Sequence, residues 1–425
     1  MKILHLTSGY EYGGGSLAVK TLHEALLASG VDSQVISHRL VGAYRGVSLF
    51  QSQLSPAGRI LRTIRNYFPR AYWQHQAAQA ISPYEVLQYF DEPLSEEVAL
   101  RSPDADIYHI HWTGGFVNGF RMLPILTRRG HVVWTFHDME PMTGGCSYSK
   151  GCENFFYRCG NCHFLKNHSE SDLSRKNWLK KRRYLQRVDK SRIHIHVASR
   201  WMQEQVRLSS IWRSFPVTFI PFKIDTRVFH SRNRREAKLA LGLNENVTTL
   251  LFAAARIDNP IKGFSTLRKA LELLPQKDGL HLLLVGAAVG IDLTALPLPF
   301  THYDAIGNPH LMNLIMRGSD IFVMPSQWET FGLTAHEAAA SGCLCLISDT
   351  SGLRDAAEEW KNVRLIPYDD APSWASAIMS ARDDIQQRLI QSEVADFNSV
   401  NINNPLGLYI ERFINFYRGI LTRKK

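Results

Sequence analysis

The feature of this sequence that most restricts its fold is a repeated succession of a short apolar run, a loop and a helical pattern. The loops are rich in glycine or polar residues. Apolar strands that alternate with helices are typical of parallel sheets covered by helices on both faces. The runs are Ile3–Leu6, Gln34–Ile36, Ile107–Ile110, Val132–Phe136, His194–Ala198, Thr248–Ala254, His281–Val285, Asp320–Met324 and Cys343–Ile347. The sequence therefore predicts an α/β fold built from doubly wound parallel sheets.

The number of predicted strands and the length of the chain indicate two domains. A chain of 425 residues exceeds what one hydrophobic core usually serves. The hinge-like segment Ser209–Phe222 separates two groups of strands. We predict Rossmann-like domains over 1–210 and 216–395. The last segment, 396–425, contains an apolar-periodic helix, Leu408–Leu421, that we expect to pack back across both domains.

Composition excludes disordered and fibrous proteins, because hydrophobic residues make up 45% and charged residues 21% of the chain. The formal net charge of +10 favours an anionic partner: a phosphorylated small molecule, a phospholipid surface or a nucleic acid. The apolar stretch Leu280–Phe300 is interrupted by polar residues and falls short of the ~20 apolar residues of a membrane span. No secretory leader precedes Ile3–Leu6, so we expect a cytoplasmic protein, in which structural disulfides are rare.

Unusual residues follow the predicted strands, where ligands of doubly wound sheets bind. They are Gly13–Gly15, His111-Trp112, His137-Asp138, Arg256 and Glu329. Two domains that present these strand ends to each other would form a cleft. This placement predicts a ligand site to which both domains contribute.

The segment 325–338 carries two carboxylates near a predicted helix start. Glu329 falls on a loop after a strand, and Glu337 on the first turns of a helix that begins near Gly332. Free backbone N–H groups at a helix start suit a diphosphate, and carboxylates accept hydrogen bonds from vicinal hydroxyls. Two Glu at such a place could also be dipole partners only. Arg256 and Lys262 favour the ligand site, because two cations after one strand can neutralise a departing diphosphate.

These residues resemble retaining glycosyltransferase family 4, which has the GT-B fold. Glu329 and Glu337, separated by seven residues, resemble its E-x7-E signature, and Arg256…Lys262-Gly263 is similar to its diphosphate-binding motif. The turn 351–355 is similar to its later Gly-rich turn.

The first loop, Gly13–Gly15, and the strand-end His137 also have counterparts in the family. The resemblance runs from residue 3 to about 370 in motif order. The chain departs from the family at Phe222-Lys223, where members commonly have Asn-Gly before Ile-Asp. This departure affects what can be carried over to the hinge and leaves the donor-side motifs intact.

The resemblance implies a role for each matching residue. Glu329 would hold hydroxyls of the donor sugar, Glu337 the ribose diol, Arg256 and Lys262 the diphosphate, while His137 would approach the sugar ring. The implied donor-binding set is completed by Gly14, Gly15, Phe331, Gly332, Leu333 and Thr334. The donor would be a nucleoside-diphosphate sugar, and the chemistry would need no metal. The family retains the anomeric configuration without an established protein nucleophile. His111 stays open as a general base, which would permit inversion.

Four cysteines lie within seventeen residues, in the spacing C-x5-C-x6-C-x2-C: Cys146, Cys152, Cys159 and Cys162. Four thiolates in a reducing compartment favour structural zinc, while an iron–sulfur cluster, disulfides and free thiols stay open. The loop 139–171 is too long to stay ordered without such a crosslink. A subset of the family similar to bacterial enzymes of exopolysaccharide and cell-surface polysaccharide synthesis carries a comparable Cys-rich insertion.

Two basic segments, 59–70 and 175–187, combine Arg and Lys with apolar and aromatic residues. Such a helix can lie on an anionic membrane, where lipid-linked sugar acceptors are found, or can be an ordinary surface helix. We therefore expect a glycan or lipid-linked acceptor and a peripheral position on the inner face of the cell membrane.

Other functions remain open at this stage. A GT-B sugar-nucleotide epimerase or phosphorylase would share the donor site. The basic charge and the cysteines could also indicate a zinc-containing nucleic-acid-binding protein. Against this, the basic residues are spread along the chain and no histidine pair follows the cysteines at finger spacing, so we expect no nucleic-acid partner.

Overall fold

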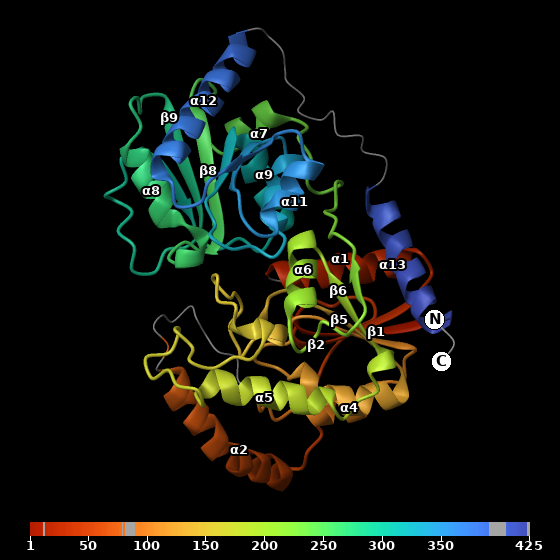
Figure 1. The fold of residues 1–425 in the computed structure, drawn as a ribbon. Helices are drawn as coiled ribbons and strands as arrows, with labels where there is room; N and C mark the ends of the chain where they lie inside the picture. The colour runs from red at the N-terminus through yellow and green to blue at the C-terminus, as the bar shows by residue number, and fades with distance from the viewer. Residues whose placement is uncertain (12, 79, 81–89, 391–404, 423–425) are drawn as a thin grey trace. The chain divides into compact units, whose positions relative to one another are not determined.

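A computed structural model gives the fold and describes residues 1–425 except 12, 79, 81–89, 391–404 and 423–425. The chain divides into two compact units (Figure 1). The first unit consists of Met1–Pro221 with Gly407–Lys425, and the second of Phe222–Leu406. The expected boundary lay between 210 and 216. The first unit runs further because residues 217–219, inside the hinge-like segment, form a strand of its sheet.

The first unit contains a seven-stranded parallel sheet of order β3-β2-β1-β4-β5-β6-β7. Its strands are β1 (Lys2–Gly9), β2 (Asp32–Arg39), β3 (Val47–Leu49), β4 (Ile107–Ile110), β5 (His131–Thr135), β6 (Ile193–Val197) and β7 (Val217–Phe219). Its helices are α1 (Gly14–Ala28), α2 (Pro56–Ala77), α3 (Ser95–Arg101), α4 (Gly119–Arg129), α5 (Leu173–Leu185), α6 (Arg200–Leu208) and α13 (Pro405–Thr422). The strand order reverses between β1 and β4, which marks the carboxyl ends of these strands as a ligand position.

The two faces of this first sheet differ in chemistry. One face of each central strand enters a large apolar core shared with α3, α4, α5 and α6. On the other face, covered by α1 and α13, buried histidines replace aliphatic residues at several positions (Figure 1). His5 of β1 pairs in register with His109 of β4, and Thr135 of β5 with His196 of β6. The strands are therefore less uniformly apolar than the sequence pattern indicated.

The second unit contains a six-stranded parallel sheet of order β10-β9-β8-β11-β12-β13. Its strands are β8 (Thr248–Arg256), β9 (Leu280–Ala287), β10 (Phe300–Tyr303), β11 (Ile321–Met324), β12 (Leu344–Ser348) and β13 (Val363–Ile366). Its helices are α7 (Arg234–Ala240), α8 (Phe264–Glu272), α9 (Pro309–Gly318), α10 (Leu333–Ala340), α11 (Leu353–Glu359) and α12 (Ala371–Ile390). Here the order reverses between β8 and β11.

Both faces of the second sheet are apolar, as the continuous apolar runs predicted. Along β8, Leu250 and Phe252 enter the core beneath α8 and α12, and Leu251 enters the core on the opposite face. Alternate residues of a strand point to opposite faces, so two separate cores require an apolar residue at every position. The prediction of doubly wound parallel sheets is confirmed in both units.

Several helices begin at side chains that the local sequence supplies. Asn118, Asp172, Ser199 and Asn308 precede α4, α5, α6 and α9, and each side chain accepts a hydrogen bond from a backbone N–H of the first turn. Such caps satisfy N–H groups that the helix itself leaves unpaired. None of the helices in the described parts of the chain combines the length and apolarity that spanning a membrane requires.

Candidate functional site

The loops at the carboxyl ends of β8 and β11 bring two predicted site residues into direct contact. Lys262 ends a short 3-10 helix, Pro260–Lys262, and its Nζ lies 2.6 Å from Oε1 of Glu329. Both side chains are largely buried, with exposed fractions of 28% and 10%. The cation predicted for the diphosphate and the carboxylate predicted for the sugar therefore lie side by side, although 67 positions separate them in sequence.

Glu329 is held in place by the loop that follows β12. Its backbone N–H donates to Oγ of Ser351 at 2.9 Å, and its carbonyl accepts from the N–H of Gly352 at 2.9 Å. Oγ of Ser326 donates to the carboxylate at 3.2 Å. The turn 351–355, predicted as a Gly-rich motif, thus positions the backbone of Glu329.

Two glycines make this packing possible. A Cβ on Gly263, which has φ 71°, would lie 1.8 Å from the carbonyl oxygen of Pro325. A Cβ on Gly352 would lie 2.1 Å from the carbonyl oxygen of Thr330. Because both obstacles are backbone atoms, a larger residue at either position would displace the loop that carries Glu329.

Arg256, the other predicted cation, ends β8 and contacts a different carboxylate. Its Nη2 lies 2.6 Å from Oδ2 of Asp258, two residues along the chain. About half of the Arg256 side chain is exposed. The structure thus places Arg256 and Lys262 in one loop, each next to an acid.

Glu337 lies on the second turn of α10, whose first residue is Leu333, as the sequence predicted. The side chain is half-buried, and burial raises the pKa of its carboxyl to about 7. A carboxylic acid removed from water favours its neutral form, which can donate as well as accept a hydrogen bond. Gly332 before the helix has φ 79°, and Thr334 in the first turn is half-buried.

Phe331 has a structural task that the sequence did not indicate. Its ring is stacked on His336 with centroids 4.3 Å apart, and meets Phe222 edge-on at 5.5 Å. The side chain is buried. Any contribution of Phe331 to ligand binding therefore falls to its backbone.

In the first unit, the glycine loop and the strand-end histidine meet. α1 begins at Gly14, and a Cβ on Gly15 would lie 3.4 Å from Nδ1 of His137 and 3.5 Å from Cβ of Trp112. Burial, with a smaller effect of His196, lowers the pKa of His137 to about 3. His137 is therefore a neutral imidazole at physiological pH.

Asp138, next to His137, is a strand-end residue that the sequence singled out without indicating a role for it. Burial and the neighbouring Glu140 raise the pKa of its carboxyl to about 7. Its Oδ1 accepts the backbone N–H of Glu140 at 2.9 Å. An acid with a pKa near neutrality at a strand end is a recurrent feature of functional sites.

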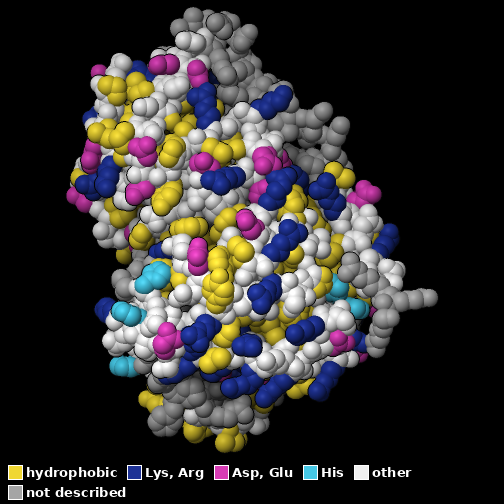
Figure 2. All heavy atoms as spheres, in the orientation of Figure 1, with side chains coloured by type: hydrophobic (Ala, Val, Ile, Leu, Met, Phe, Trp, Pro, Cys, Tyr) yellow, Lys and Arg dark blue, Asp and Glu magenta, His cyan; other side chains and the backbone are white. Residues whose placement is uncertain are grey.

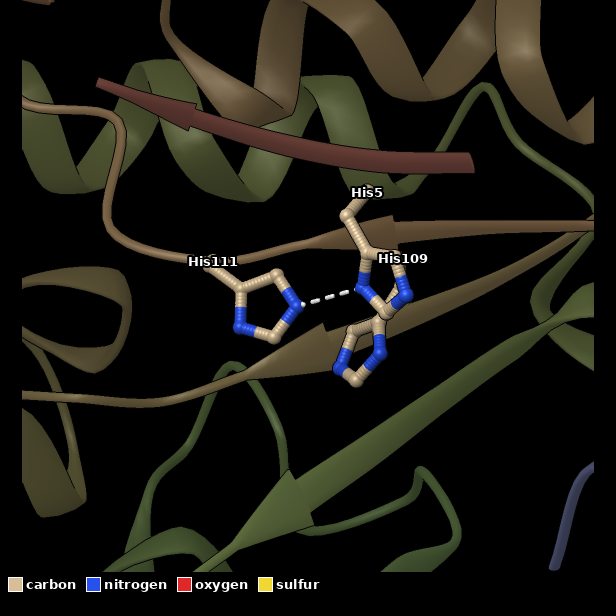
Figure 3. Close-up of side chains that lie close together, drawn as sticks. All are labelled: His5, His109 and His111. Carbon is tan, nitrogen blue, oxygen red and sulfur yellow. Dashed lines mark hydrogen bonds between the residues drawn. The ribbon is translucent and has the colours of Figure 1, made fainter. Parts of the chain in front are cut away.

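Beneath these loops lies a group of buried histidines, of which the sequence pattern had indicated only His111. Within the described parts of the chain, His5, His109 and His111 are the one group of three potential ligands whose atoms all lie within 4.8 Å of one another (Figure 3). His109 also forms hydrogen bonds with two hydroxyl groups, through Nδ1 with Tyr417 of α13 and through Nε2 with Thr135. The available signal was the placement of His109 in a buried strand, two residues before His111.

The four predicted metal ligands lie in the insertion between β5 and α5. Burial raises the pKa of Cys159 to about 12 and that of Cys162 to about 11, and Cys152 adds a smaller upward shift to both. Burial also raises the pKa of Cys146, with smaller contributions from the other three cysteines. The N–H of Gly144 donates to Sγ of Cys159 at 3.1 Å. No three of these sulfurs come within 4.8 Å of one another in the described structure. The four thiols therefore lie in one insertion without close contact among any three of them. The N–H···S hydrogen bond would stabilise a thiolate at Cys159.

The comparisons with known proteins agree with this architecture. Residues 248–384, which contain the Lys262–Glu329 pair and Glu337, match the family described as "Glycosyl transferases group 1". Sucrose-phosphate synthase from Thermosynechococcus elongatus matches 100% of both chains with a TM-score of 0.62 and 17% identity. Anabaena HepE, solved in complex with UDP and glucose, covers 99% of this chain and 100% of its own with a TM-score of 0.59 and 15% identity. The fold is GT-B.

A relative in sequence covers a smaller part of the GT-B chain. D-inositol 3-phosphate glycosyltransferase from Paenarthrobacter aurescens is 29% identical over 180 residues, which are 40% of this chain and 43% of the relative. The match thus spans less than half of that relative. The likeness to solved structures covers the whole chain and shows that both units share the fold.

Proposed function

We propose that the protein is a retaining glycosyltransferase that moves a sugar from a nucleoside-diphosphate sugar to a hydroxyl acceptor. The observation that carries the proposal is the contact between Lys262 and Glu329 at the ends of β8 and β11, inside the segment that matches glycosyl transferases group 1. A cation for the departing diphosphate and a carboxylate for sugar hydroxyls are the two groups that such a donor requires. The solved HepE structures, which contain UDP with glucose or UDP-glucose, support a donor of this class.

In this proposal each residue of the second unit has one task. Glu329 accepts hydrogen bonds from hydroxyls of the transferred sugar, and Glu337 accepts them from the ribose diol. Lys262 and Arg256 bind the diphosphate, and the N–H groups at the start of α10, next to Gly332, stabilise its charge. On binding, the diphosphate competes with Glu329 for Lys262 and with Asp258 for Arg256, so the cations exchange one anion for another.

The first unit contributes His137 to the transferred sugar, with Gly14 and Gly15 at the start of α1 assigned to the donor phosphates. We propose retention of the anomeric configuration, because the groups assigned so far stabilise the leaving diphosphate and none is a nucleophile or a base behind the anomeric carbon. Same-face departure and attack then follow, with the leaving group neutralised by Lys262 and Arg256. NMR of the new glycosidic bond tests this, and inversion would contradict it.

We propose a glycan or lipid-linked acceptor and a peripheral position on an anionic membrane. Four apolar residues of α2, namely Ile60, Leu61, Ile64 and Tyr67, are each about 60–68% exposed, and the helix sequence is rich in arginine. An amphipathic helix of this composition suits the interface of an anionic bilayer. The second basic segment behaves differently. Trp178 and Leu185 of α5 pack into the core, and Lys181 is buried against Glu140, while other Lys and Arg side chains of the segment lie on the surface (Figure 2).

The membrane proposal is testable by sedimentation with vesicles. Ile64→Ser should reduce binding to vesicles of anionic lipid and leave the weak binding to neutral vesicles unchanged. Leu239→Ser is the matched control, because Leu239 of α7 is exposed to the same extent in the second unit. Equal sedimentation of wild type and Ile64→Ser with anionic vesicles would count against an α2 membrane contact.

We also propose that Cys146, Cys152, Cys159 and Cys162 hold one structural zinc ion. Supporting features are the N–H···S bonds to Cys159 and Cys162 and the left-handed residues in the turn between them, Gly160 with φ 137° and Asn161 with φ 48°. Zinc would bind thiolates at two buried cysteines, Cys159 and Cys162, and at two half-buried ones, Cys146 and Cys152. Metal analysis of reduced protein purified without a His tag should find close to one zinc per chain, and folded protein without zinc or iron would dismiss the idea.

The central experiment is a thermal-shift screen with nucleoside diphosphates and their sugars. A ligand that binds the native state at a hundred times its Kd adds about 2.7 kcal/mol of stability. We expect one nucleoside diphosphate to raise the melting temperature, followed by its release in the presence of an acceptor. Release of nucleoside diphosphate without transfer, or epimerised donor, would indicate the GT-B epimerase or phosphorylase alternative. No stabilisation by any nucleotide would refute the donor site.

A further inference from the structure

Three histidine rings of the first unit form a continuous chain of nitrogen contacts, which we call the histidine chain. Nδ1 of His5 lies 3.0 Å from Nε2 of His111, and Nδ1 of His111 lies 3.3 Å from Nε2 of His137. The first link is drawn in Figure 3. His5 belongs to β1, His111 follows β4 and His137 follows β5, so three neighbouring strands each supply one ring.

All three rings are neutral at physiological pH. Burial lowers the pKa of His5 and of His137 to about 3, and lowers that of His111 well below its usual value. A neutral imidazole has one N–H and one bare nitrogen. Each link of the chain must therefore pair an N–H with a bare nitrogen, which permits only two arrangements of the three protons.

The two arrangements differ at the ends of the chain. In one, His5 donates to His111, His111 donates to His137, and the proton of His137 is on Nδ1. In the other, every bond is reversed: His137 donates through Nε2, and the proton of His5 is on Nε2. The tautomer of His137 is thus tied to that of His5 through His111.

The buried end of the chain selects between them. Nε2 of His5 is inaccessible and has no hydrogen-bond partner among the described residues. The reversed arrangement would leave a buried N–H without an acceptor, whereas the first leaves only a bare nitrogen there. Unpaired buried N–H groups are rarer in proteins than unpaired acceptors, so the first arrangement is favoured.

We infer that His111, itself oriented by His5, is a positioning residue that fixes His137 in the tautomer with its proton on Nδ1. That nitrogen is the one that faces Gly15 at the start of α1. The catalytic meaning rests on the proposed function: His137 then meets the donor sugar or phosphate as a hydrogen-bond donor and not as a base. His111, with both nitrogens engaged, is not a general base either.

A second row of hydrogen bonds beside the chain has a proton order that is fully determined. The carbonyl of Ile220 can only accept, so Nε2 of His196 carries a proton, and Nδ1 of His196 accepts from the hydroxyl of Thr135. Thr135 must then accept from Nε2 of His109, whose Nδ1 accepts from the hydroxyl of Tyr417. The face of the sheet thus holds ordered imidazoles whose tautomers are set by fixed neighbours.

The same bonds argue against a metal ion between His5, His109 and His111, although their nitrogens lie close enough. Both nitrogens of His109 and both of His111 are engaged, and His5 offers only Nε2. None of the three is hydrogen-bonded to a carboxylate, the usual partner of a metal-bound histidine, in the described structure. The hydrogen bonds of these three histidines are therefore explained by control of their tautomers, without a metal ion.

The test is the protonation state of His137 read from ¹⁵N chemical shifts of histidine side chains in selectively labelled protein. His137→Gln assigns its signals by their loss. We expect a protonated Nδ1 and a bare Nε2 on His137 in the wild type, without any substrate. A protonated Nε2, or averaged signals, would overturn the inference whatever the outcome of the nucleotide screen.

A substitution in the middle of the chain gives the complementary result. His111→Phe keeps a ring and removes both nitrogens, so the signals of His137 should change from one tautomer to an average of two. His23→Phe is the matched control: His23 is a buried histidine near His5 with its own partners, Ser33 and Arg45, and should leave His137 unchanged. An unaltered His137 in folded His111→Phe would refute the positioning role. So would a change in the ¹⁵N shifts of His5 and His111 when zinc is added. If His111→Phe does not fold, the wild-type spectrum decides by itself.

Discussion

The two units of this chain have the same layout and opposite chemistry at their strand ends. In both, a parallel sheet reverses its strand order at the centre, between β1 and β4 in the first unit and between β8 and β11 in the second. The first unit places neutral histidines at this point, on one buried face of the sheet. The second has apolar residues on both faces and charged pairs in the loops beyond them.

The difference shows how a polar group can enter a sheet. A buried imidazole can stay neutral and satisfy its nitrogens with neighbours, so it is tolerated inside a strand such as β4. A lysine or glutamate loses far more on burial and is found where a partner and partial exposure are available, as in Lys262–Glu329. The first unit is thereby suited to orienting hydrogen-bond donors, and the second to neutralising charge.

The largest predicted effect is acid sensitivity of the first unit, and its absence would break this comparison. The folded pKa values of His5, His137 and His196 are lowered to about 3, 3 and 4 from an unfolded value near 6.5. Their stabilisation is complete above pH 6.5 and is lost as the pH falls. At pH 5 each has lost about 2 kcal/mol. Asp138, with its pKa raised to about 7, has the opposite effect: it adds about 2 kcal/mol to the stability as the pH falls from 7 to 5.

The stability of the second unit should change little between pH 7 and pH 5. His336, with its pKa lowered to about 3, loses about 2 kcal/mol at pH 5, and Glu337, with its pKa raised to about 7, regains about as much between pH 7 and pH 5. Hydrogen exchange corrected for its intrinsic pH dependence, resolved by peptide, measures both units in one sample. Equal loss of protection in the two units at pH 5 would contradict the assignment of charge-free histidines to the first.

A substitution at Gly263 tests how rigidly the second unit holds its charged pair. Gly263→Ala puts a Cβ against the carbonyl oxygen of Pro325 and an alanine at φ 71°, and should cost about 3 kcal/mol, with loss of the Lys262–Glu329 contact. Gly242→Ala is the control, because Gly242 has φ 67° and open space around its Cα. It should cost only about 1 kcal/mol. Similar melting temperatures for the two variants would show that the loop adapts freely.

The charged residues of the second unit are expected to separate binding from turnover. Glu337→Ala should weaken nucleotide-sugar binding and Glu329→Ala should mainly lower kcat, each by about ten- to a hundredfold, since a charged hydrogen bond contributes roughly 1.5–3 kcal/mol. Glu272→Ala, an exposed acid at the end of α8 that pairs with Arg268, is the control. Wild-type kinetics in both site variants would remove the assignment.

The smallest predicted effect concerns the attachment of α13 to the first unit. Tyr417→Phe removes the hydroxyl that donates to Nδ1 of buried His109 at 2.7 Å and keeps the ring. A lost neutral hydrogen bond of this kind costs about 1 kcal/mol. Urea unfolding of the first unit measures it. Tyr409 is another buried tyrosine of α13, and Tyr409→Phe gives the reference stability for losing a buried tyrosine hydroxyl that does not contact His109. A Tyr417→Phe protein no less stable than that reference would contradict the proton order of the row.

Much of the fold could be predicted from local sequence. The run Ile107–Ile110 coincides with β4, and the helix predicted over Leu408–Leu421 falls inside α13. Some short strands were the exception. β7 lies inside the segment interpreted as a hinge, and β10 begins at Phe300, where no strand was predicted. Three or four residues carry too little periodicity to indicate a strand, and pairing with a neighbour defines it.

By itself the sequence determined the alternation of strands and helices and the two sheets. It also placed Arg256, Lys262 and Glu329 at or just beyond strand ends and Glu337 on the helix that follows. These depend on periodicity and on glycines, which act over a few residues. Only the tertiary structure decided which side chains meet: Lys262 with Glu329, and His5 with His111. Contacts between residues far apart in sequence depend on strand register and on which face of the sheet each residue occupies, and a one-residue shift would reverse them.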